Sequence, residues 1–159
     1  MAIAVREARA DDYDELCAII DQVDGLHREH LPHIFCQPPG PVRERAYILD
    51  LLDDTGVGLF VAEVEGQLAG LAHVVVREAP PVPLLVPRRV AIVDNLVVRN
   101  DLRRLGVGRT LMDRVYRWAR AQGAVEVELT VYEFNEPAIA FYTSLGYETS
   151  SRRMSKRLE

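Results

Sequence analysis

Apolar and polar residues follow one another along the chain in patterns typical of strands and of amphipathic helices. Taken in order, these patterns predict the succession β-α-α-β-β-β-α-β-α-β. The expected strands are Ala2–Glu7, Gly58–Gln67, Leu68–Arg77, Arg89–Val98, Val125–Val131 and Tyr147–Leu158. Four helices are expected. The first begins at Asp11-Asp12, the second spans Val42–Leu52, the third runs from near Val107 to Gln122-Gly123, and the fourth spans Glu136–Leu145.

Short polar and proline-containing stretches mark the expected connections. Glu65-Gly66 separates two strand-like runs and predicts a β-hairpin. Asp12 with Glu15 fits a capping box at the start of the first helix. The segment His27–Pro41 is rich in His and Pro, and Ala79–Pro87 contains four prolines, so both predict irregular connections.

The segment from Arg89 to Val131 predicts a strand–helix–strand unit. Such a crossover joins parallel strands with a right-handed connection, whereas the hairpin before it is antiparallel. Arg89–Val98 is almost continuously apolar, which favours a central strand that is buried on both faces. We therefore expect an α/β (α+β) fold with a mixed, mostly antiparallel central sheet flanked by helices. The 159 residues contain no repeat or linker, so a single domain over residues 1–159 is expected.

Composition and charge exclude several classes of protein. The chain is 48% hydrophobic and 27% charged, like ordinary globular proteins, and its net charge of −5 argues against general nucleic-acid binding. No apolar run is long enough to cross a bilayer and no signal-peptide pattern is present, so we expect a cytoplasmic protein without a membrane partner. Cys17 and Cys36 lack metal or redox spacing. His27, His30 and His33 lie in a predicted loop, which favours a pocket-lining role over a metal site.

The most specific feature is the stretch from Val97 to Met112, where a strand leads into Arg-x-x-Gly-x-Gly and then a helix. Free backbone N–H groups at a helix start can bind a phosphate or pyrophosphate. A dinucleotide fingerprint requires a third glycine where Leu111 stands, and a nucleotide P-loop requires Gly-Lys-Ser/Thr, which is absent. Gly106 and Gly108 lack a Cβ atom, so a bulky pyrophosphate can approach the backbone. A simple tight turn with a solvated arginine also fits this motif.

A second motif follows one strand later. It reads Asn135-Glu136-Pro137-Ala138-Ile139-Ala140-Phe141-Tyr142-Thr143-Ser144-Leu145-Gly146-Tyr147. With both motifs, the sequence resembles the GCN5-related N-acetyltransferase (GNAT) family. That family carries a Gln/Arg-x-x-Gly-x-Gly/Ala loop for the coenzyme A pyrophosphate and an Asn-x-x-Ala-x-x-Phe-Tyr-x-x-x-Gly-Phe segment, with Tyr147 here replacing the last Phe. The opening Val5–Ala8, followed by Asp11 and Asp12, also resembles the family's start.

The resemblance implies a GNAT-like fold and direct transfer of an acetyl group from acetyl-CoA, the cosubstrate, to a primary amine of a small molecule or peptide. It also implies a donor site that combines the glycine loop, backbone of the preceding strand for the pantetheine arm, and two residues of the second motif. These residues are Leu96, Val97, Val98, Arg103, Arg104, Leu105, Gly106, Val107, Gly108, Arg109, Asn135 and Tyr142. No metal is expected, and homodimer formation is left open. A non-catalytic acyl-CoA-binding sensor is the alternative function.

Direct transfer requires an uncharged amine. An ammonium with a pKa near 10.4 is mostly protonated at pH 7, and its deprotonation there costs roughly 4.6 kcal/mol. A general base would lower this barrier. Asp94, on the strand before the loop, is the first candidate and Glu133, after the next strand, is the second. A solvated or paired carboxylate is the alternative reading of Asp94.

Tyr142 matches the family tyrosine that faces the sulfur, where its hydrogen bond would stabilise developing charge. A core aromatic beside Phe141 is the alternative, and Asn135 also fits a plain helix cap. The segment His27–Pro41 and the loop Ala79–Pro87 are expected to line the acceptor pocket. His73 is expected to be structural or to contact the acceptor.

Overall fold

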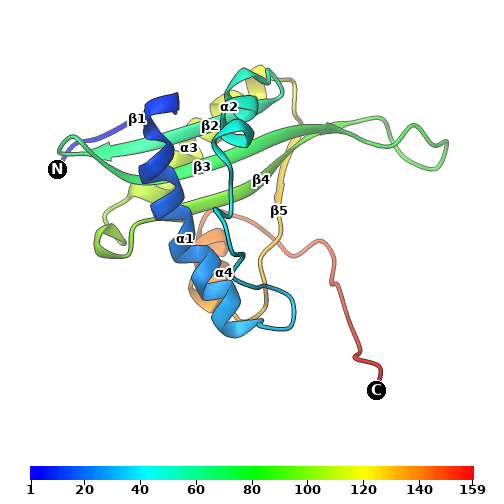
Figure 1. Cartoon of the computed structure of the whole chain (residues 1–159). Coiled ribbons are helices and arrows are strands. Elements are labelled where there is room, and N and C mark those ends of the chain that lie inside the picture. The colour runs from blue at the N-terminus through cyan, green and yellow to red at the C-terminus, as the bar shows by residue number, and fades with distance from the viewer. The chain divides into compact units, whose positions relative to one another are not determined.

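The computed structural model, which describes residues 1–159, contains a five-stranded sheet in the order β1-β2-β3-β4-β5 (Figure 1). The chain divides into two units, Met1–Leu129 and Thr130–Glu159, called here the first and the second unit. The first unit contains β1 (Ile3–Glu7), α1 (Tyr13–His30), α2 (Arg45–Asp53), β2 (Val57–Val64), β3 (Gln67–Glu78), β4 (Arg89–Val98), α3 (Val107–Ala121) and β5 (Glu126–Leu129). The second unit contains α4 (Glu136–Ser144). The expectation of a single domain over residues 1–159 stays a prediction.

The pairing of the strands confirms the expected fold class. Neighbouring strands from β1 to β4 are antiparallel, whereas β4 and β5 are parallel and are connected through α3. Glu65 and Gly66 have φ values of 52° and 78°, and two consecutive positive φ values are what a type I′ hairpin turn requires. β4 occupies the expected residues Arg89–Val98 and lies between two partner strands.

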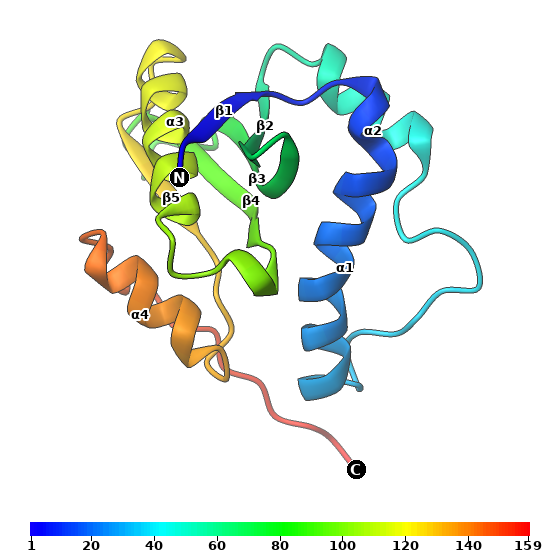
Figure 2. The same cartoon turned by 90° about the vertical axis from the view of Figure 1, so that its left-hand side faces the viewer.

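Helices cover both faces of the sheet within the first unit. α1 and α2 lie on one face and α3 on the other (Figure 2). The core under α1 and α2 is formed by apolar side chains from these helices and from β2, β3 and β4, including Leu16, Ile19, Leu59, Leu71 and Val97. Alternation along each strand directs every second side chain toward this layer.

α3 packs closely against the opposite face of the sheet. Its buried stripe consists of Val107, Leu111, Met112, Val115 and Ala119. A Cβ atom at Gly70 on β3 would lie 2.6 Å from the carbonyl oxygen of Val97 and 3.3 Å from Cδ1 of Leu111. Because the first distance is shorter than any normal contact, glycine is required here for β4 and α3 to approach β3.

The predicted last strand, Tyr147–Leu158, is wrong. Residues 147–159 form no strand, and β5 is shorter than the predicted Val125–Val131. The apolar residues Met154 and Leu158 are 90% and 89% exposed. The polar residues around them give no alternating face that could be buried, so the sequence offers little driving force for a strand.

Two expectations at the ends of α1 are also wrong. Asp12 does not cap the helix with its side chain; its carboxylate instead accepts a hydrogen bond of 2.7 Å from the backbone N–H of Arg9 and two from Arg6. At the other end, the helix continues to His30 although an irregular segment was expected from His27. The His27 ring stacks on Phe35 at 5.1 Å, and this contact supports the last helical turn.

The ion pair of Arg6 with Asp12 predicts a pH-dependent contribution to stability. The hydrogen bond from Arg6 lowers the pKa of the buried Asp12 carboxyl. The ion pair therefore contributes fully to the free energy of unfolding above about pH 3.9, the pKa of an Asp carboxyl in the unfolded chain. This contribution is lost as the pH falls through the lower pKa that Asp12 has in the folded protein. We expect Asp12→Asn to reduce the free energy of unfolding by about 1–3 kcal/mol at pH 7.

Urea denaturation at pH 7 and at pH 3 measures this difference. The exposed neighbour Asp11 provides the matched control, Asp11→Asn, which is expected to change the free energy of unfolding by less than about 0.5 kcal/mol. A loss for Asp12→Asn that is equally large at pH 3 would show that charge is not its cause.

Candidate functional site

The loop before α3 has an unusual backbone that places the start of the helix at Val107, as expected. Arg104 and Gly106 both lie in the left-handed region, with φ values of 64° and 90°. A Cβ atom at Gly106 would meet only Cδ1 of Ile3, at 4.0 Å, so the space beside it is open. The positive φ of Gly106, rather than crowding within the chain, is therefore what favours glycine here. A non-glycine residue such as Arg104 in this region is often found at binding sites.

The same loop presents a row of free backbone donors. The N–H groups of Arg104–Arg109 have no hydrogen-bond acceptor, and Gly106 provides no side-chain cap for α3. The first engaged donor of the helix is the N–H of Thr110, which bonds the carbonyl oxygen of Gly106 at 3.0 Å. An anion of the size of a pyrophosphate can accept several such hydrogen bonds at once.

The charges around this loop also favour an anion. Arg103, Arg104 and Arg109 have no carboxylate partner. Nε of Arg103 donates to the carbonyl oxygen of Val98 at 3.4 Å. The first turn of α3 contains no acidic residue. Because the N-terminus of a helix is the positive end of its dipole, cations there repel it unless an anion is bound. By contrast, Arg99 is paired with Asp101 at 2.7 Å.

The strand that leads into the loop has one unpaired edge within the first unit. The parallel register of β4 with β5 ends at Val93 and Leu129, whereas β4 continues to Val98. The backbone of Asn95–Val98 is paired with β3 only. The side chain of Val97 is buried in the core, so its backbone and side chain can serve different purposes. This is the part of the strand, Leu96–Val98, expected to pair with the pantetheine arm.

Asp94 lies where the pairing of β4 with β5 stops. His73 of β3 is opposite Asn95, but the next residue, Val74, is opposite Val93. Asp94 is therefore the extra residue of a β-bulge, and it is exposed. Bulges redirect side chains and are frequent beside active sites. The sequence placed Asp94 on a strand but contained no signal for the bulge.

The second unit contains the other predicted site residues. Oδ1 of Asn135 accepts a hydrogen bond of 3.3 Å from the N–H of Ala138, which confirms its capping role. The Tyr142 ring is half-buried and makes edge-to-face contacts with Phe141 at 5.3 Å and with Tyr147 at 5.5 Å. Glu133 is exposed in the turn before α4.

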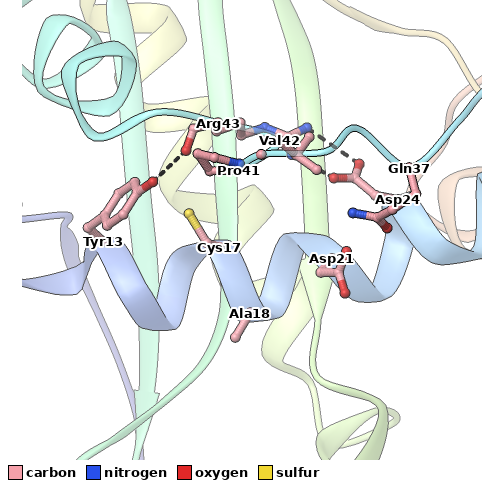
Figure 3. A pocket seen from close by; sticks show the side chains of 10 residues that line it. Tyr13, Cys17, Ala18, Asp21, Asp24, Gln37, Pro41, Val42 and Arg43 are labelled. Atoms are coloured by element: carbon pink, nitrogen blue, oxygen red, sulfur yellow. Dashed lines mark hydrogen bonds and ion pairs between the residues drawn. The ribbon is translucent and has the colours of Figure 1, made fainter.

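A cavity of about 360 Å³ lies in the first unit between α1 and the segment 37–43 (Figure 3). The Tyr13 hydroxyl donates to the carbonyl oxygen of Arg43 at 2.5 Å, and the Arg43 guanidinium donates to Asp24 at 2.6 Å. Figure 3 shows Tyr13, Cys17 and Asp24 pointing from α1 toward this segment. Part of the segment His27–Pro41, which was predicted to line a pocket, therefore forms one wall of this cavity. The opposite wall, which α1 forms, was not predicted from the sequence.

The structure contains no group of three or more His, Cys, Asp or Glu side chains that is placed to hold a metal ion. None of its helices combines the length and the apolar character needed to span a bilayer.

Comparisons with known proteins place these observations in context. Residues 21–147 match the model of the Acetyltransferase (GNAT) family. An uncharacterized N-acetyltransferase of Methanocaldococcus jannaschii is 33% identical over 106 residues, which are 64% of this chain and 46% of that protein. The chain spans less than half the length of this relative and of three further curated relatives that it matches.

Solved structures share the fold over almost the full chain. A mutant of the BH1408 protein of Bacillus halodurans superposes with a TM-score of 0.93 at 25% identity, covering 98% of this chain and 99% of that one. An aminoglycoside N-acetyltransferase in complex with CoA has a TM-score of 0.74 at 18% identity, covering 98% and 99%. At this identity the second similarity concerns the fold alone.

Proposed function

Because this chain belongs to the GNAT acetyltransferase family, we propose that it transfers an acetyl group from acetyl-CoA directly to a primary amine of a small molecule or peptide. The observation that carries the proposal is the row of unengaged N–H groups at Arg104–Arg109, beside arginines without carboxylate partners. If this loop served only as a tight turn, the arginines beside it would repel the positive end of the helix dipole with no compensating interaction.

Backbone N–H groups of Arg104–Arg109 bind the pyrophosphate, with charge-assisted help from Arg103 and Arg104. The unpaired backbone edge of Leu96–Val98 binds the pantetheine arm. Asn135 belongs to the same donor site by the family's pattern. Bound acetyl-CoA supplies the acetyl group as a thioester, which an uncharged amine attacks.

Two side chains would serve the chemical step. Asp94 removes a proton from the acceptor ammonium, a role that its exposed position at the bulge supports, with Glu133 as the second candidate. Tyr142 donates a hydrogen bond to the sulfur as negative charge develops on it. Neither the proton removal nor the hydrogen bond to sulfur requires a metal ion.

A screen of chemically diverse primary amines with acetyl-CoA tests this function. We expect release of free thiol together with an amine product heavier by one acetyl group, measured by mass spectrometry. Reactions with coenzyme A in place of acetyl-CoA provide the control. Tight binding of acetyl-CoA without turnover of any amine would contradict the enzyme and favour a non-catalytic acyl-CoA sensor.

A further inference from the structure

A histidine inside the first unit has a buried nitrogen atom without a hydrogen-bond partner. His73 lies on β3 with 5% of its surface exposed, and its Nε2 atom meets no donor or acceptor. An unpaired buried polar atom destabilises the folded state, and folded proteins contain few of them. An apolar residue would fill this position at lower cost, so the nitrogen calls for a functional explanation.

The His73 side chain faces the layer of the sheet that α1 covers. Its cross-strand neighbour on β2 is Leu59, and Leu71 precedes it by two positions on β3. Both leucines belong to the core cluster that includes α1 residues. Because side chains alternate along a strand, His73 points to the same face as Leu71.

The β-bulge of β4 lies beside His73. Asn95 is opposite His73 and Val93 is opposite Val74, so Asp94 is inserted between two residues that face opposite sides of the sheet. Asp94 makes none of the ion pairs of the structure and is exposed. Asp94, whose carboxylate forms no ion pair, is therefore adjacent in β4 to the residue opposite His73, whose Nε2 atom has no partner.

Burial of the His73 imidazole lowers its pKa and keeps the ring neutral at pH 7. Burial lowers the pKa of the imidazole, Asp94 on β4 raises it, and Arg43, from the segment before α2, lowers it, with a net decrease. The facing residue of β2, Leu59, is apolar. A neutral ring beside a carboxylate can take up a proton and form an ion pair with it.

We propose that His73 and Asp94 form a proton-accepting pair, in which Asp94 takes a proton from the acceptor ammonium and its unrestrained side chain then turns and passes the proton to the imidazole of His73. The inference rests on the proposed function and adds His73 to it as a positioning residue behind the base. One N–H bond of the ammonium breaks first, and its electron pair stays on nitrogen. This electron pair of the nitrogen then forms the C–N bond, while the electrons of the C–S bond leave with the sulfur. A second proton of the nitrogen goes to the sulfur to give the thiol, and His73 returns its proton to solvent.

An NMR titration without substrates tests the pairing itself. The ring signal of His73 is followed against pH in the wild type and in Asp94→Asn. Loss of the negative charge is expected to lower the midpoint by about half to one pH unit. Asp113→Asn, the same change at an exposed position of α3 on the opposite face of the sheet, is expected to leave it unchanged. An unmoved midpoint in Asp94→Asn would overturn the pair regardless of activity.

Kinetics of His73 variants test its role in the reaction, with the amine that reacts fastest in the screen above. His73→Leu and His73→Gln are each expected to lower kcat by about tenfold or more. The KM for acetyl-CoA is expected to stay within about twofold of the wild type. The acidic limb of the kcat profile is expected to move to lower pH, because Asp94 alone then accepts the proton. A purely structural histidine would not move that limb.

Stability measurements complete the test. The Tm of His73→Leu is expected to be no lower than that of the wild type, since an unpaired polar atom is removed. If this variant fails to fold, His73→Gln retains a polar side chain at the same site. Wild-type kcat in either folded variant would overturn the proposal while amine acetylation stands. Failure of the wild type on every amine would contradict the proposed function, and the NMR titration would still report the pairing.

Discussion

Tyr142→Phe is expected to lower kcat for acetyl transfer by about a hundredfold. The change removes the hydroxyl that would donate a hydrogen bond to the sulfur as the thioester breaks, an interaction made mainly in the transition state. The aromatic ring and its edge-to-face contacts with Phe141 and Tyr147 are kept. The Kd for acetyl-CoA is therefore expected to stay within about twofold, as measured by calorimetry beside steady-state kinetics.

Tyr147→Phe is the matched control for this substitution. Tyr147 also belongs to the second unit, and its ring contacts that of Tyr142 edge to face at 5.5 Å, so both rings belong to one packed group. Loss of its hydroxyl is expected to change kcat by less than about threefold. Equal losses of kcat and of acetyl-CoA affinity in Tyr142→Phe would instead mean that Tyr142 is mainly structural.

Gly108→Trp is expected to raise the Kd for acetyl-CoA by about a hundredfold, or roughly 2.7 kcal/mol. Gly108 is half-buried in the first turn of α3, among the N–H groups that would hold the pyrophosphate. An indole there would occupy the space that the phosphates need. The Tm is expected to hold, because tryptophan has a higher helix propensity than glycine.

Gly108→Ala provides the comparison of size at this position. A single methyl group is expected to raise the Kd by about tenfold or less, between the wild type and the tryptophan variant. Unchanged affinity in a folded Gly108→Trp protein would place the pyrophosphate elsewhere. Calorimetry and thermal unfolding on the same samples separate the two effects.

Features with a local signal could be predicted from the sequence. Glu65-Gly66 has the composition of a hairpin turn, and the almost continuously apolar run Arg89–Val98 has that of an interior strand. Both are found as expected. The loop before α3 was also predictable, because Gly106 stands where a positive φ is required and a helix follows at once. In each case, neighbours in sequence determine the structure.

Features that depend on partners distant in sequence could not be predicted. The bulge at Asp94 arises from the register between β3 and β4, which no residue of β4 announces by itself. Asp12 had the pattern of a helix cap, but Arg6 on β1 and the N–H of Arg9 engage its carboxylate instead. The unpaired nitrogen of His73 is visible only once the sheet and α1 enclose it.

In the proposed function the N–H groups before α3 anchor the coenzyme, and backbone amide NMR measures this anchoring. Coenzyme A is titrated into the ¹⁵N-labelled protein and the amide signals are followed residue by residue. We expect the amides of Arg104–Arg109 to show the largest shifts, since they change from unengaged donors to phosphate-bound ones. Saturable binding of coenzyme A that leaves these amides unmoved would contradict it.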